Sequence, residues 1–97
     1  MIGSFDDEAT ADLYHGRPTR RVVRFHPDLR KAALRKLDML DAAHRLRDLA
    51  SPPGNRLEAL RGDLAGAHSV RVTDQWRLVF RWTPNGPEDV RLLDYHS

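Results

Sequence analysis

The sequence predicts an α+β fold in which two to three N-terminal helices pack on a three- to four-stranded antiparallel sheet. Three observations lead to it. Apolar residues recur at helical spacing in the first half of the chain and alternate with polar residues in the second. The segment "SPPGN" separates the halves, and its prolines and glycine predict a loop. In the second half, Asn85-Gly86 is a dipeptide typical of β-hairpins.

The first helix is expected within "SFDDEATADLYHG", and residues 1–4 are a candidate short strand before it. Ser4 and Asp7 can form a capping box, acidic residues fill the first turn, and Gly16 can end the helix. The segment "RPTRRVV" that follows is interpreted as a basic connector.

A longer helix is expected to begin near Pro27, because proline is favoured at the first helical position. Its core-facing residues recur at helical spacing and are Leu29, Ala33, Leu37 and Leu40. A further helical turn in "AHRLRDLA" precedes the loop.

The strands follow in the order of the chain. "RLEAL" is the first candidate, and "HSVRV" is the second, with a tight turn expected at residues 73–75. The third strand alternates apolar residues with Arg77, Val79 and Arg81; the apolar residues are Trp76, Leu78, Phe80 and Trp82. Both tryptophans are expected to pack on the sheet. "DVRLLDYH" forms the last strand, so the sheet is predicted to be an antiparallel meander.

Composition narrows the class of protein. A chain of 97 residues with 40% hydrophobic and 31% charged residues suits one soluble domain, spanning residues 1–97. The sequence has no cysteine and no long apolar stretch, so we expect a cytoplasmic protein without disulfides. Residues 15–36 carry eight basic side chains against one acid, which points to an anionic partner. The scattered histidines lack ligand spacing, so no metal site is expected.

Three sequence elements carry a resemblance to a known family. They are Leu57, Leu60, Arg61 and Gly62; then Ser69, Val70, Arg71, Val72, Trp76, Arg77, Leu78 and Phe80; and finally Asp94, Tyr95 and His96. Together they resemble the HigB branch of the RelE/ParE toxin superfamily, from bacterial type II toxin–antitoxin modules. Some members of this branch have a histidine where this chain has Glu58.

The resemblance implies an endoribonuclease that cleaves mRNA on the translating ribosome and needs no cofactor. It also implies a partner, an antitoxin of the HigA type with a helix-turn-helix, through which alone the toxin would meet operator DNA.

Metal-free cleavage of RNA requires an acid, a base and fixed cations near the phosphate. The resemblance assigns catalysis to the terminal group and two arginines: Asp94, Tyr95, His96, Arg77 and Arg61. An imidazole titrates near neutrality, so His96 is expected to be the general acid. Asp94, which shares its strand face with His96, can accept the 2′-hydroxyl proton or orient His96. Tyr95 would face the other way in a regular strand.

Further side chains are expected to bind RNA or to assist. The expected RNA-binding residues are Arg71, Arg20, Arg21 and Arg24. Glu58 is either a base or inert. Two alternatives to the nuclease stay open: a ParE-like toxin that acts on DNA gyrase without cleaving RNA, and an inactive family member that only binds antitoxin.

Overall fold

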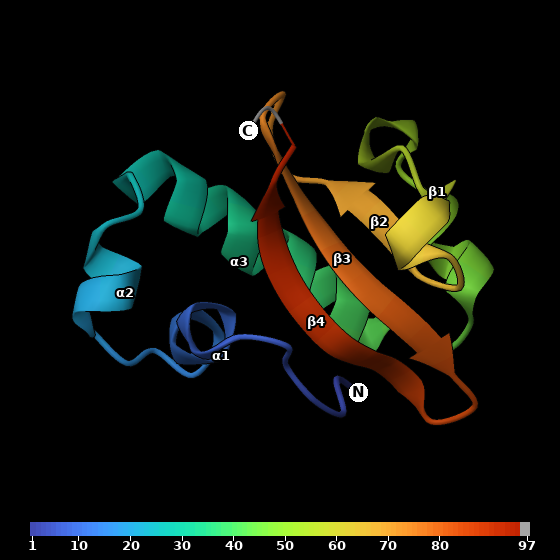
Figure 1. The fold of residues 1–97 in the computed structure, drawn as a ribbon, viewed down its shortest axis with the longest axis horizontal. Coiled ribbons are helices and arrows are strands. Elements are labelled where there is room, and N and C mark those ends of the chain that lie inside the picture. The colour runs from blue at the N-terminus through green and yellow to red at the C-terminus, as the bar shows by residue number, and fades with distance from the viewer. Residues whose placement is uncertain (96–97) are drawn as a thin grey trace.

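The computed structural model describes residues 1–95 of the chain. Its centre is a four-stranded antiparallel sheet in the order β1-β2-β3-β4 (Figure 1). The strands are β1 (Glu58–Ala59), β2 (His68–Arg71), β3 (Trp76–Thr83) and β4 (Gly86–Asp94). The predicted meander and the α+β fold class are therefore confirmed, although β1 is only two residues long.

The helices precede the sheet in the chain. They are α1 (Glu8–Tyr14), α2 (Arg20–Val23) and α3 (Pro27–Ala42), followed by the 3-10 turns η1 (Leu46–Ala50), η2 (Pro53–Asn55) and η3 (Gly62–Leu64). The interpretation of residues 17–23 as a connector was wrong, because α2 lies within it. A helix of one turn has no apolar period to reveal it; burial of Val22 in the core holds it in place.

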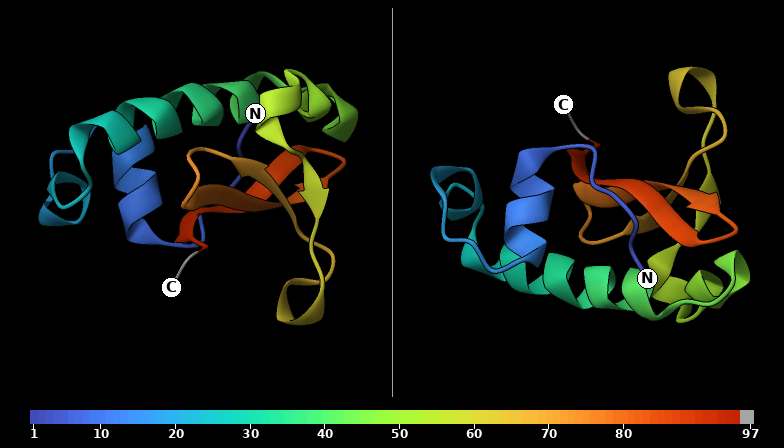
Figure 2. Two further views of the ribbon diagram at one scale, coloured as in Figure 1. Left: turned by 90° about the horizontal axis from the view of Figure 1, so that it is seen from above. Right: turned by 90° about the horizontal axis from the view of Figure 1, so that it is seen from below.

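The longest helix, α3, begins at Pro27, as the sequence predicts. His26 caps it by accepting a hydrogen bond from the Asp28 amide. The predicted face is buried against the sheet: Leu29, Ala33, Leu37 and Leu40. Figure 2 shows α3 lying across one face of the sheet, which leaves the opposite face free of any long helix among residues 1–95.

Strand register decides which side chains share a face. Val70 pairs with Leu78, and Leu78 pairs with Leu92, so these residues lie on the face that α3 covers. Trp76 and Trp82 pack against the same core, and the Trp76 ring meets Phe25 with centroids 5.6 Å apart. The other side, here called the outer face, receives the alternate residues of each strand.

The N-terminal segment differs in detail from its prediction. Asp7 is the N-cap of α1 and accepts from the Thr10 amide, whereas Ser4 hydrogen-bonds the Asp89 amide and takes no part in a capping box. Residues 1–4 form no strand of their own. Instead, Phe5 makes a parallel bridge with Val90 at the edge of β4. Gly16, with φ +72°, follows α1 as predicted.

Candidate active site

Arg77 is a buried, hydrogen-bonded cation on the outer face. It lies in β3 opposite Arg71 of β2, and only 8% of its surface is exposed. Its Nε donates to Ser69 Oγ at 2.8 Å, and its Nη2 donates to the carbonyl of Arg56 at 2.5 Å. Arg56 has left-handed backbone geometry (φ 45°) at the end of η2, which helps to aim that carbonyl at the guanidinium. Arg77 is therefore held in one orientation.

Two further side chains border the guanidinium. Glu58 pairs with Ser69 in the β1–β2 register, and its Oε1 lies 3.6 Å from Arg77 Nη1. The guanidinium carbon of Arg77 lies 5.5 Å from the centre of the Tyr95 ring. Glu58, Ser69, Arg77 and Tyr95 together are called the Arg77 cluster below. The cluster joins β1, β2 and β3 to the end of the last strand.

The terminal residues divide between the two faces of the sheet. Asp94 pairs with Trp76, so it lies on the α3 side of β4, and it accepts a hydrogen bond from Gln75 Nε2 at 2.8 Å. Strand β4 ends there, and Tyr95 follows in a turn with its amide bonded to the Gln75 carbonyl at 2.7 Å. The structure thus brings Tyr95, and not Asp94, against Arg77. His96 lies outside the described residues.

The other predicted arginines of the sheet region are more exposed. Arg61 stands exposed at the start of η3, three residues after Glu58. Arg71 is half-buried beside Arg77 and forms an ion pair with Asp74. Arg71 is next to Arg77 across the β2–β3 pair, whereas Arg61 follows β1, two strands from β3 and toward the other end of β2.

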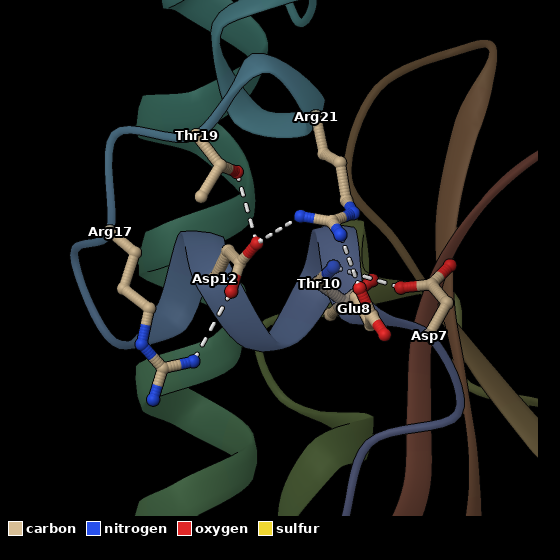
Figure 3. Close-up of polar contacts among 7 residues, drawn as sticks. All are labelled: Asp7, Glu8, Thr10, Asp12, Arg17, Thr19 and Arg21. Atoms are coloured by element: carbon tan, nitrogen blue, oxygen red, sulfur yellow. Dashed lines mark hydrogen bonds and ion pairs between the residues drawn. The ribbon is translucent and has the colours of Figure 1, made fainter.

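The two arginines of α2 and its C-cap, Arg24, lie elsewhere. Figures 1 and 2 place α2 beyond α1, past the β4 edge of the sheet and therefore far from the opposite edge, where β1 lies. Arg20 and Arg24 are exposed, but Arg21 bonds Glu8 at 2.5 Å and Asp12 at 3.3 Å (Figure 3). The structure therefore does not bring these arginines into the Arg77 cluster.

Asp12 is the buried carboxylate that organises this second region. It accepts from Arg17 at 3.2 Å and from Thr19 Oγ1 at 3.0 Å, in addition to Arg21 (Figure 3). Burial by itself would raise the pKa of Asp12, but the hydrogen bonds from Thr19 and Arg17 and the charges of both arginines outweigh it. The pKa is consequently lowered from its ordinary value of 3.8.

The arrangement supports electrostatic chemistry on a phosphate. A guanidinium that is already oriented needs no reorganisation when negative charge develops beside it.

Among residues 1–95, no group of three or more histidine, aspartate or glutamate side chains could hold a metal ion. No helix in the same range is long and apolar enough to cross a membrane.

Sequence reasoning missed two partners of Arg77. Ser69 lies two residues before Arg71 on the same face of β2, and this parity was a usable signal. The carbonyl of Arg56 left no signal, because a backbone acceptor in a loop cannot be read from residue types.

Comparison with known proteins places the chain in context. A family model described as the RelE-like toxin of type II toxin-antitoxin system HigB matches residues 3–96. Toxin HigB-1 of Vibrio cholerae serotype O1 is 41% identical over 97 residues, which cover 100% of this chain and 99% of that protein. A Haemophilus influenzae protein, described only as uncharacterized, is 40% identical over 70 residues, covering 72% of this chain and 68% of its own length.

A solved structure shares the fold. The YoeB-YefM complex from Staphylococcus aureus contains a chain that matches with a TM-score of 0.60 and 17% sequence identity. The match covers 100% of this chain and 99% of that chain. At this identity, the likeness concerns the arrangement of helices and strands alone.

Proposed function

This chain belongs to the family of RelE-like HigB toxins of type II toxin–antitoxin systems, and from that premise we propose that it is an endoribonuclease that cleaves mRNA on the translating ribosome. The work of such an enzyme would take place in the cytoplasm and would stop translation. We further propose that its partner is a HigA-like helix-turn-helix antitoxin, which would bind operator DNA on behalf of the pair.

The proposed reaction is a transfer within the RNA strand. The 2′-hydroxyl oxygen attacks the adjacent phosphorus while its proton passes to water, and Asp94, on the face of β4 away from Arg77, would orient His96. The bond from O2′ to phosphorus forms and the bond from phosphorus to O5′ breaks, while His96 gives a proton to the leaving 5′-oxygen. The products are a 2′,3′-cyclic phosphate and a 5′-hydroxyl, so atoms and protons balance without a metal.

One observation carries this proposal: the fixed guanidinium of Arg77 at the end of the sheet where β4 delivers the terminal residues. Arg77 pairs with Leu93, and Asp94 and Tyr95 follow directly. Nε and Nη2 of Arg77 are used by Ser69 and Arg56, so Nη1 is the nitrogen that a phosphate oxygen would meet. Tyr95 would bound the site from one side. Arg61 would bind a neighbouring phosphate, and Arg71 would attract the strand.

Glu58 has a defined place in this scheme. Its carboxylate lies 3.6 Å from Nη1, in the direction from which a phosphate oxygen would approach. More than half of the Glu58 side chain is exposed, so it can turn into solvent at small cost. We therefore assign Glu58 the role of a resident anion that RNA displaces.

Primer extension on mRNA in a translation extract tests the proposal. His96→Ala should lower cleavage by at least about 10²-fold, because the proposed general acid is removed. Full cleavage by His96→Ala would refute the assignment. Gyrase-linked DNA breaks in cells, with no RNA products, would show the ParE-like activity instead.

A further inference from the structure

The short helix α2 stands between two apolar hollows on the surface. A hollow of about 360 Å³ lies between α1, α2 and the start of α3, where Leu13, Val22 and Leu34 line it. A second hollow, of about 340 Å³, opens beside Pro18 and Val23. Pro18 lines both, so they are neighbouring parts of one surface, here called the α2 surface.

Every charged side chain that lines the α2 surface is basic. Within residues 1–95, its lining includes no acid; its charged members are Arg17, Arg20, Arg24, Arg30 and Lys31. The nearby acids Glu8 and Asp12 are already paired with Arg21 and Arg17 (Figure 3). A concave surface with charge of one sign attracts a partner of the opposite sign.

The walls of this surface are fixed before any partner arrives. Asp12 ties down Arg17 and Thr19 on the segment that leads into α2, and Arg21 on α2 itself (Figure 3). Val22 is buried in the core, whereas its neighbour Val23 is 59% exposed in the midst of the basic side chains. A preformed surface loses little conformational entropy on binding, which favours a defined complex.

The chemistry of the surface favours a protein segment over RNA. Single-stranded RNA is held by aromatic stacking together with phosphate contacts, and no aromatic ring lines either hollow within the described chain. An amphipathic helix or strand can instead place apolar side chains in the hollows and carboxylates against the basic rim. Such a partner would use both the apolar floor and the positive rim.

We propose that the α2 surface is a docking site for an acidic, amphipathic segment of the antitoxin. This inference rests on the proposed function, since it takes the antitoxin as partner. On this chain, Val23 and Leu34 would make the apolar contacts with the partner, and Lys31 is among the cations that would receive its acids.

The test uses the full chain and the antitoxin encoded in the adjoining reading frame. Isothermal titration would compare the double variant Val23→Asp/Lys31→Glu with the matched control Ala50→Asp/Arg47→Glu, whose positions are exposed on η1 at the other end of α3. We expect the first double variant to raise the dissociation constant at least about tenfold, because its new acids would face the acids of the antitoxin. The control should change the dissociation constant by less than about twofold. Both free variants should melt like the wild type and cleave mRNA at its rate.

Several outcomes would overturn the inference. Equal antitoxin affinity of the two double variants would remove the docking role. Retained affinity together with reduced cleavage on the ribosome would show that the α2 surface contacts RNA. Failure of the wild-type chain to bind the adjoining protein would refute both the partner and its docking site. If the wild-type chain binds the antitoxin tightly but cleaves no mRNA, the nuclease proposal is wrong. Weaker binding by the Val23→Asp/Lys31→Glu variant would then still support the docking site.

Discussion

At the scale of single residues, Arg77 combines a structural role with the proposed role in RNA binding. Its bonds to Ser69 and to the Arg56 carbonyl hold β3, β2 and the segment after η2 together. The same bonds fix the direction of Nη1, the nitrogen proposed to meet RNA. Loss of Arg77 alone therefore cannot separate catalysis from folding, and the variant has to be read with a stability measurement beside it.

Arg77→Lys should be unstable as well as inactive. A lysine keeps the charge but cannot reach Ser69 Oγ and the Arg56 carbonyl at once, so buried acceptors lose their donors. We expect the free energy of unfolding to fall by about 2–4 kcal/mol in urea denaturation. Arg81→Lys, at an exposed position of the same strand, should change it by less than about 0.5 kcal/mol. Equal stabilities of these two variants would contradict the structural role of the Arg77 hydrogen bonds.

Glu58→Gln distinguishes a displaced anion from a catalytic base. An exposed ion pair contributes at most about 1 kcal/mol, so removing the carboxylate should raise cleavage at low mRNA concentration by up to about fivefold. Primer extension with a titration of mRNA measures this. A fall of about 10²- to 10⁴-fold would instead identify Glu58 as the proton acceptor. Asp63→Asn, which removes an exposed carboxylate in η3, is the matched control.

At the scale of elements, the joint between α1 and α2 depends on one carboxylate. Asp12 lies on α1 and accepts hydrogen bonds from Arg17 and Thr19 of the connecting segment and from Arg21 of α2. A helix of four residues cannot persist by its own hydrogen bonds. The position of α2, and with it the α2 surface, is thus set by this network and by the burial of Val22.

The Asp12 network should appear as a dependence of stability on pH. The pKa of Asp12 is lowered in the folded chain from its ordinary value of 3.8, so the carboxylate stabilises the fold fully above that value. This contribution is lost as the pH falls through the folded pKa. Melting temperatures of Asp12→Asn between pH 7 and pH 3 should therefore fall less on acidification than those of the wild type. Equal slopes would contradict the argument, and Asp63→Asn should retain the wild-type slope.

At the scale of the whole molecule, the sequence predicted features that depend on neighbouring residues better than features that depend on contacts between distant segments. Pro27, the spacing from Leu29 to Leu40 and the Asn85-Gly86 turn predicted α3 and the meander, because helix periodicity and turn chemistry depend on neighbouring residues. The Arg77 cluster needed the β1–β2 and β2–β3 registers and also the β3–β4 register, which shifts between Val79 and Arg81. Sequence parity put Asp94 and Tyr95 on opposite faces but could not say which one faces Arg77.

The first residues of the chain close the sheet at its last strand, a long-range contact that the sequence did not reveal. The amides of Gly3 and Asp6 bond to the carbonyls of Pro87 and Val90, and the Val90 amide bonds to the Ser4 carbonyl. Removing residues 2–5 would break two of these three bonds and withdraw the Phe5 ring from the core.

Because each hydrogen bond contributes about 1 kcal/mol and the half-buried Phe5 ring at least as much, the free energy of unfolding should fall by about 3 kcal/mol with residues 2–5 removed. That is a large share of the stability of a small domain. Urea denaturation measures the loss, and hydrogen exchange at the Val90 amide should accelerate in parallel. Phe5→Ala isolates the share of the ring, since it keeps the backbone pairing. If the shortened chain unfolds at the wild-type urea concentration, the edge of β4 does not need this cover, and its unpaired groups would instead be free to recruit another chain.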